Sequence, residues 1–210
     1  MDGNNRYSRK KNISQFDSYK LGARKLIEIA DFIFDHYETE IISTFALSVN
    51  NRKRSKKLIS ILMKVLEYFL DQKTTDTNNK FQIIFKGDLS FLPKKLLDKI
   101  LQLEKNNLKS KKKLLIYFNY SGRLDILNAC KNKSKNLNLN NFNNHLITKN
   151  VTDPDILIRT GGFQRLSDFF LFQISFTELF FLKKLWPEIK KSDVSKVIEN
   201  YKSIERKFGH

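Results

Sequence analysis

The stretch DILIRTGG, residues 155–162, joins a short apolar strand to a pair of glycines. Glycines at the carboxyl end of a parallel strand let the backbone approach a ligand closely, and this edge of an open α/β sheet is where ligands bind. Arg159 lies inside the stretch, and Arg165 and Ser167 follow it. Guanidinium groups match phosphate oxygens bidentately. The pattern therefore predicts a diphosphate receptor, and its alternative is a surface loop with exposed arginines.

Outward from this stretch, strand-like and helix-like segments alternate along the whole chain, which is typical of a parallel sheet flanked by helices. Residues 131–144 are nearly all Lys, Asn, Ser and Leu, and they predict a solvated connector or a weak surface helix. We expect one α/β domain over residues 1–210 with a central, mostly parallel sheet. The predicted helices are 21–37, 55–72, 92–105, 122–130 and 193–208, and the predicted strands are 40–48, 81–85, 114–118 and 155–159.

The chain is strongly basic, with 39 Lys and Arg against 22 Asp and Glu and a formal charge of +17. Nucleic acid, an anionic membrane surface or a polyphosphate substrate would each suit this charge, and so would simple overuse of Lys and Asn. Cys130 is the single cysteine, which excludes an intrachain disulfide and favours a reducing compartment. The first six residues are polar and residues 169–182 are too interrupted to span a bilayer, so we expect a cytoplasmic protein.

Two further segments carry groups suited to phosphate chemistry. In MDGNNR, residues 1–6, a predicted turn could direct backbone amides at an anion, and Asp2 offers a hard oxygen ligand for Mg²⁺. In SVNNRKR, residues 48–54, Asn51 could orient a substrate group and Arg54 could neutralise phosphate. Each has a plainer alternative, an ordinary turn in the first case and a capped helix entry in the second.

Read together, these segments resemble the undecaprenyl diphosphate synthase, or cis-prenyltransferase, family. The opening is similar to the family signature Met-Asp-Gly-Asn-x-Arg-aromatic, and the resemblance continues in order over nearly the whole chain. The other matching segments are KLGA (20–23), FALS (45–48) with Asn51 and Arg54, GD (87–88), NYSGR (119–123) with Asp125 and Ile126, DILIRTGG (155–162) with QRLS (164–167), ELFF (178–181), LWP (185–187) and ERKFG (205–209).

This resemblance implies a Mg²⁺-dependent enzyme that extends an allylic prenyl diphosphate, usually farnesyl diphosphate, with isopentenyl diphosphate to give cis-polyprenyl diphosphates. It implies catalytic roles for Asp2 and Asn51, and a metal site at Asp2 and Glu178. It also implies a homodimer, an apolar tunnel lined by helices 21–37 and 55–72, and transient contact with a membrane surface. The substrate-binding residues that it implies are Gly3, Asn4, Asn5, Arg6, Tyr7, Gln15, Tyr19, Ser48, Arg54, Arg159, Arg165, Leu166 and Ser167.

The chain departs from the family pattern at several positions. Gln15 and Tyr19 replace an arginine and a histidine that contact the allylic diphosphate, and Phe163 replaces an acid after the glycine pair. Asn50 and Arg52 stand where the family has Glu and Trp, and Asp168 replaces an Asn. The family also has a strand before the opening motif. We therefore expect either a start upstream of Met1 or a diverged paralogue, with Asp2 on a free terminus.

Two other functions fit parts of the sequence. A catalytically impaired paralogue could act as partner subunit of an active prenyltransferase, and the departures favour this reading. A basic nucleic-acid-binding protein would explain the charge, but no recognisable RNA- or DNA-binding module is present, and we expect no specific nucleic-acid partner. Product chain length, the preferred primer and the effect of the departures on turnover do not follow from the sequence.

Overall fold

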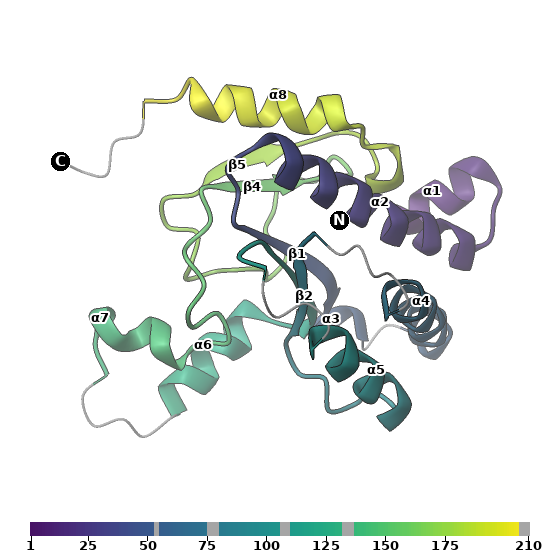
Figure 1. The fold of residues 1–210 in the computed structure, drawn as a ribbon, viewed down its shortest axis with the longest axis horizontal. Helices are drawn as coiled ribbons and strands as arrows, with labels where there is room; N and C mark the ends of the chain where they lie inside the picture. The colour runs from purple at the N-terminus through teal and green to yellow at the C-terminus, as the bar shows by residue number, and fades with distance from the viewer. Residues whose placement is uncertain (53–54, 75–79, 106–109, 132–136, 206–210) are drawn as a thin grey trace.

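The computed structural model describes residues 1–52, 55–74, 80–105, 110–131 and 137–205. Three parallel strands form the central sheet in the order β1-β3-β2, and a second parallel pair joins β4 to β5 (Figure 1). This arrangement confirms the predicted α/β class with parallel strands. The strands are β1 (Ile41–Ser48), β2 (Gln82–Lys86), β3 (Lys113–Tyr120), β4 (Ile156–Arg159) and β5 (Glu178–Phe181).

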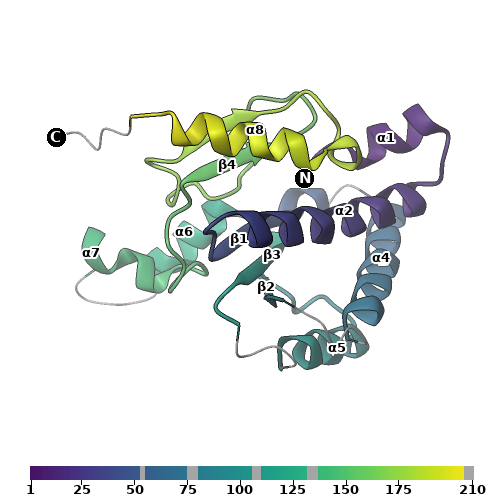
Figure 2. The same ribbon diagram turned by 45° about the horizontal axis from the view of Figure 1, so that its top comes forward.

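Helices surround these strands, as Figures 1 and 2 show. Four of them, α2, α4, α5 and α6, match predicted segments closely, although α2 begins at Gln15, six residues before the predicted start. The predicted last helix was too long, because α8 ends at Lys202; residues 206–208 lie outside the described residues. The helices are α1 (Asn4–Lys11), α2 (Gln15–His36), α3 (Val49–Arg52), α4 (Lys56–Thr74), α5 (Lys94–Lys105), α6 (Gly122–Lys131), α7 (Leu139–Phe142) and α8 (Lys191–Lys202), with 3₁₀ turns η1 (Asn143–His145) and η2 (Trp186–Glu188).

Strand β3 divides the core because its side chains alternate between two faces. Leu114, Ile116 and Phe118 pack into the main core with α2, α4 and α5. Leu115 and Tyr117 belong to a separate aromatic cluster that includes Phe170 and Phe169. One face of the sheet thus carries the large helices, and the other carries the segments that lead to β4 and away from it.

The region predicted as a connector, 131–144, contains part of α6 and the short helix α7. Phe142 in α7 is buried against Leu146 and Ala129, so this part is packed rather than wholly solvated. Residues 132–136 of the predicted connector lie outside the described residues. Among the residues that the structure describes, no helix is both long and apolar enough to cross a membrane.

Candidate active site at the carboxyl ends of the strands

Asp2 lies against the carboxyl end of β4, where three backbone hydrogen bonds hold it. Its N–H donates to Thr160 Oγ1 at 2.9 Å, and the same hydroxyl donates to the Asp2 carbonyl oxygen at 3.0 Å. The Trp186 N–H donates to that carbonyl as well, at 2.9 Å. The expectation that Asp2 hangs on a free terminus was wrong, because residues about 160 and 184 positions away fix its backbone.

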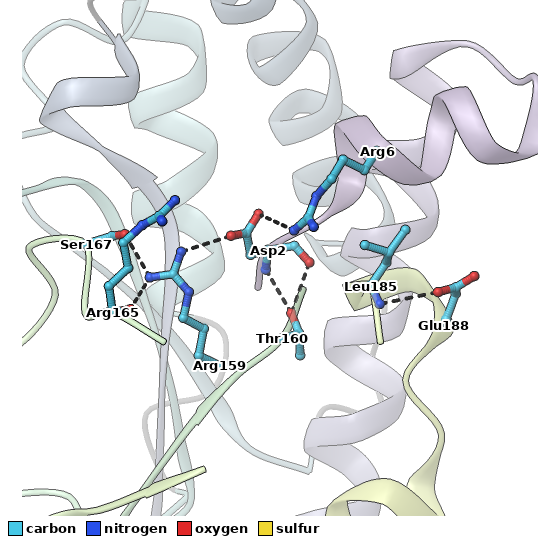
Figure 3. Close-up of polar contacts among 8 residues, drawn as sticks. All are labelled: Asp2, Arg6, Arg159, Thr160, Arg165, Ser167, Leu185 and Glu188. Atoms are coloured by element: carbon cyan, nitrogen blue, oxygen red, sulfur yellow. Dashed lines mark hydrogen bonds and ion pairs between the residues drawn. The ribbon is translucent and has the colours of Figure 1, made fainter. Parts of the chain in front are cut away.

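The carboxylate of Asp2 faces two arginines (Figure 3). Arg159 Nη2 donates to Oδ2 at 3.0 Å, and Arg6 Nη2 lies 3.6 Å from Oδ1. Arg159 Nη1 also donates to Ser167 Oγ at 2.7 Å and to the Arg165 carbonyl oxygen. Since its side chain is only 12% exposed, Arg159 is a fixed bridge between Asp2 and the loop of residues 165–167.

Both predicted glycines adopt backbone conformations that favour glycine, with φ of +87° at Gly161 and +80° at Gly162. A Cβ on Gly161 would lie 2.4 Å from Arg6 Nη2 and 3.3 Å from Asp2 Cβ. Because Gly161 has no side chain, Arg6 and Asp2 can lie this close to its backbone. The Gly161 N–H donates to the Lys184 carbonyl at 2.7 Å, which ties this turn to the segment after β5.

The predicted anion-binding turn at the start of the chain is the beginning of a helix. Gly3, with φ of +107°, precedes α1, and no side chain caps this helix end. A Cβ on Gly3 would meet the Leu185 side chain at 2.8 Å, so only glycine fits. The first N–H groups of a helix lack intrahelical partners and attract anions. The helix start and Arg6 thus add donors beside Asp2.

Asn4 and Asn5 contact α2. Gln15 Nε2 donates to Asn5 Oδ1 at 2.7 Å, and Asn4 packs so closely on Gly22 that a Cβ there would lie 2.3 Å from Asn4 Oδ1. Asn4 Oδ1 is buried and has no hydrogen-bond partner among the described residues. It can accept a hydrogen bond from a ligand.

An apolar cavity of about 90 Å³ adjoins Asn4, between α2, α4 and the sheet. Its position matches the two helices that the sequence analysis expected to line a tunnel; the tunnel itself stays a prediction. The lining residues are Met1, Asn4, Tyr19, Gly22, Ala23, Leu26, Ala46, Leu62, Val65, Leu66, Phe69, Phe85, Ile116, Phe118 and Trp186. A polar cluster therefore stands at one side of a cavity that suits a hydrocarbon chain.

The loop that carries Ser167 is strained and anchored to α6. Ser167, Asp168 and Phe170 have φ of +53°, +69° and +49°, values that L residues seldom adopt. The Asp168 carboxylate accepts hydrogen bonds from the Arg123 N–H at 3.0 Å and from the Ser121 hydroxyl, and its carbonyl accepts from the Gly122 N–H at 2.8 Å. Asp168 thus caps α6, a role that the sequence analysis missed.

Ser48 is the last residue of β1, and its hydroxyl accepts the Asn51 N–H at 3.0 Å. Ser48 thus caps a helix, as the plainer alternative expected, but this helix is the short α3 and not the predicted helix 55–72. On the neighbouring strands, Asn119 Nδ2 donates to the Asp88 carbonyl at 3.0 Å. Hydrogen bonds from Ser90 hold the pKa of the Asp88 carboxyl below its ordinary value. Arg54 lies outside the described residues.

Glu178 is not brought to Asp2 within this chain. It pairs with Ile156 at the start of β4, whereas Asp2 contacts Arg159 at the other end of that strand. Ile156 and Arg159 are three residues apart in β4, which corresponds to about 10 Å along the strand. Within the described ranges, no group of three or more His, Cys, Asp or Glu side chains is placed to hold a metal ion. Mg²⁺ binds through one or two carboxylates with substrate phosphates and water, so Asp2 fits a Mg²⁺–diphosphate complex.

Tyr7 follows Arg6 in α1, and Leu166 lies between Arg165 and Ser167. In the described part of the chain, the Tyr7 hydroxyl has no hydrogen bond to the Asp2 cluster. Tyr19 lines the cavity. The structure therefore gathers Asp2, Arg6, Arg159, Arg165 and Ser167 and leaves Glu178 apart. Thr160, Asp168 and Trp186 support the cluster without having been predicted.

Comparisons with known proteins agree with this geometry. A tritrans,polycis-undecaprenyl-diphosphate synthase (geranylgeranyl-diphosphate specific) of Pyrobaculum aerophilum is 36% identical over 99% of this chain and 92% of its own length. An isoprenyl transferase of Helicobacter pylori is 34% identical over all of this chain and 94% of its own. A crystal structure of lavandulyl diphosphate synthase from Lavandula x intermedia, in complex with dimethylallyl diphosphate, superposes with a TM-score of 0.92 at 29% identity and covers 100% and 95% of the two chains.

A parallel α/β fold with an arginine-rich carboxyl edge beside an apolar cavity is the architecture of a cis-prenyltransferase, an enzyme that joins isoprenoid diphosphates. The undecaprenyl diphosphate synthase family model matches residues 1–209, and the chain belongs to this family.

Proposed function

We propose that this chain condenses isopentenyl diphosphate with an allylic prenyl diphosphate, with farnesyl diphosphate as primer and Mg²⁺ as cofactor. The observation that carries the proposal is the position of Asp2. Its carboxylate lies between Arg6 and Arg159, and its neighbour Asn4 borders the apolar cavity. A diphosphate placed at the arginines would direct its hydrocarbon chain into that cavity.

In this reaction a carbon–carbon bond forms between the allylic carbon and the terminal alkene carbon of isopentenyl diphosphate. Diphosphate leaves the allylic carbon, and the new chain loses one proton. Arg6 and the start of α1 would bind the allylic diphosphate, while Arg165 and Ser167 would bind isopentenyl diphosphate. The fixed guanidinium of Arg159 would stabilise charge as it develops, which is the role of preorganised donors.

Asp2 would hold Mg²⁺ against diphosphate oxygens, and the bound ion would neutralise the charge of the leaving group. We assign Asn51 to orienting diphosphate or water, since an amide is a poor base. Glu178 would join the metal site only through a rearrangement or from another subunit, because this chain places it at the far end of β5.

The proposal includes a homodimer and transient contact with anionic lipid in a cytoplasmic setting. Two exposed apolar side chains near β5 support an interface, namely Phe176 at 62% and Leu179 at 43% exposure. The charge of +17 supports attraction to an anionic surface. Light scattering of the purified protein tests the dimer, and flotation with vesicles that contain anionic lipid tests the membrane contact.

The deciding experiment incubates the protein with farnesyl and isopentenyl diphosphates, with Mg²⁺ or with EDTA, and identifies products by mass spectrometry. We expect a ladder of C5 additions that requires Mg²⁺ and disappears in Asp2→Ala. Asp35→Ala is the matched control, since Asp35 is an acid paired with Lys80 at the far end of α2. Absence of product would refute the catalytic proposal. Formation of mixed oligomers with an active homologue would then support the partner-subunit reading.

A further inference from the structure

Phe163 lies at the centre of the arginine cluster. The guanidinium carbon of Arg165 is 4.1 Å from the centroid of its ring, that of Arg6 is 4.8 Å and that of Arg159 is 5.9 Å. These cations come from three segments, namely the loop after β4, helix α1 and the end of β4. All three distances are within the range of a cation–π interaction.

The cluster carries an excess of positive charge. Among the residues that the structure describes, Asp2 is the one carboxylate within salt-bridge distance of Arg6 or Arg159, and Arg165 has no carboxylate partner. Three guanidiniums and one carboxylate leave a formal charge of +2. These like charges repel one another, so a further attractive partner beside Asp2 favours their close arrangement.

An aromatic ring attracts cations through its quadrupole and carries no formal charge. It also accepts no bidentate hydrogen bond from a guanidinium, so it leaves available to a ligand those N–H donors that Asp2, Ser167 and the Arg165 carbonyl do not already occupy. A carboxylate at the same position, where the family pattern has an acid, would pair with a guanidinium and lower the charge of the cluster by one. Phe163 therefore holds the arginines together while it preserves both their donors and their charge.

We propose that Phe163 is a positioning residue whose ring holds Arg6, Arg159 and Arg165 in place to bind diphosphate. This inference rests on the proposed function, because it names the residue that positions the arginines for that function's substrates. The formal charge of +2 attracts the negative charge of a diphosphate, and it leaves the Asp2 carboxylate able to hold Mg²⁺. An acid at position 163 would lower this charge.

Calorimetric titration with inorganic pyrophosphate, in EDTA and in Mg²⁺, tests this inference. Phe163→Leu keeps an apolar side chain but removes the ring, and we expect its affinity in EDTA to fall about 3- to 10-fold. Phe163→Trp keeps a ring and should retain the affinity. Phe163→Glu should lose at least as much affinity in EDTA as Phe163→Leu, because a carboxylate would pair with a guanidinium and lower the charge of the cluster.

Two controls separate positioning from stability. Phe163 is 39% exposed, so the melting temperature of Phe163→Leu should stay near that of the wild type. Phe32→Leu removes a ring that also contacts a cation, Lys191 at 5.7 Å, near the end of α2 and away from the cluster, and it should leave pyrophosphate binding unchanged. Equal affinity of Phe163→Leu and wild type in EDTA, or failure of Phe163→Trp to retain it, would overturn the inference.

The same measurements distinguish this inference from the proposed function. Pyrophosphate binding that depends on the ring at position 163, in a protein without prenyl transfer, would refute the proposed function alone. Full prenyl transfer, together with pyrophosphate binding that does not depend on the ring of Phe163, would refute the inference alone. In an active enzyme, Phe163→Leu should raise the KM for isopentenyl diphosphate by a larger factor than it lowers kcat, because Arg165 lies closer to the ring than Arg159 does.

Discussion

Replacing Thr160 by Val tests whether the position of Asp2 controls the site. Valine has nearly the same shape as threonine but lacks the hydroxyl that accepts the Asp2 N–H and donates to the Asp2 carbonyl. Thr160 is 2% exposed, so water cannot replace the lost partner without cost. An unsatisfied N–H costs about 1–3 kcal/mol, while the Asp2 carbonyl keeps its bond from Trp186. We therefore expect the free energy of unfolding to fall by about 2 kcal/mol.

We expect Thr160→Val to lower kcat/KM as well as the free energy of unfolding. A displacement of Asp2 by about 1 Å should lower kcat/KM by 10- to 100-fold. Urea denaturation and steady-state prenyl transfer measure the two effects on the same preparation. Thr44→Val is the control, since it removes one buried hydrogen bond, to the Leu115 carbonyl at 3.2 Å, away from the cluster. Stability loss in Thr160→Val with wild-type kcat/KM would refute the reasoning.

Three more predictions follow from the site and its supports. Gly161→Ala and Gly162→Ala should each cost about 1–3 kcal/mol of stability for a positive φ. Gly161→Ala alone should weaken pyrophosphate binding, because its Cβ would collide with Arg6, whereas a Cβ at Gly162 would meet Lys183 at 3.9 Å, an ordinary contact distance. Asp168→Ala should cost about 1–2 kcal/mol through lost capping of α6 and should weaken pyrophosphate binding, whereas Asp168→Asn should restore most of both. Burial raises the pKa of the Asp125 carboxyl above its ordinary value of 3.8, so the native state binds this proton more tightly than the unfolded state does. The free energy of unfolding should therefore fall as pH rises from about 4 to 7. Urea midpoints measured over this range should fall less in Asp125→Asn.

The sequence predicted elements with a strong apolar pattern and missed those without one. Helix α1 has no apolar stripe in NNRYSRKK, and its position depends on tertiary contacts such as the Ser18 hydroxyl bond to the Asn4 carbonyl at 2.6 Å. Strand β5 has only four residues, and its pairing with β4 supplies the evidence that it is a strand. Local pattern therefore sufficed for the core, whereas these two elements are defined by distant partners.

The site shows the same difference between residues that a local sequence pattern identifies and residues that depend on distant partners. Arg159, Arg165 and Ser167 were predicted because they follow a strand and a glycine pair within a few residues. Thr160 and Trp186 lie in quoted segments but were given no role, since their roles depend on Asp2, which lies more than 150 positions away along the chain. The capping role of Asp168 depends on α6 in the same way. Groups that act on a ligand follow motifs, but the groups that position them become visible only in the fold.

The departures from the family pattern redistribute charge within the site rather than remove it. Gln15, where the family has an arginine, donates to Asn5 and fixes α1 against α2. Tyr19, where the family has a histidine, lines the apolar cavity. Both changes take positive charge from the side of the allylic diphosphate. Phe163 has the opposite effect on the other side, since it replaces an acid and contacts three guanidiniums. Diphosphate binding should therefore be dominated by Arg159 and Arg165, and the primer should depend more on its hydrocarbon chain for affinity.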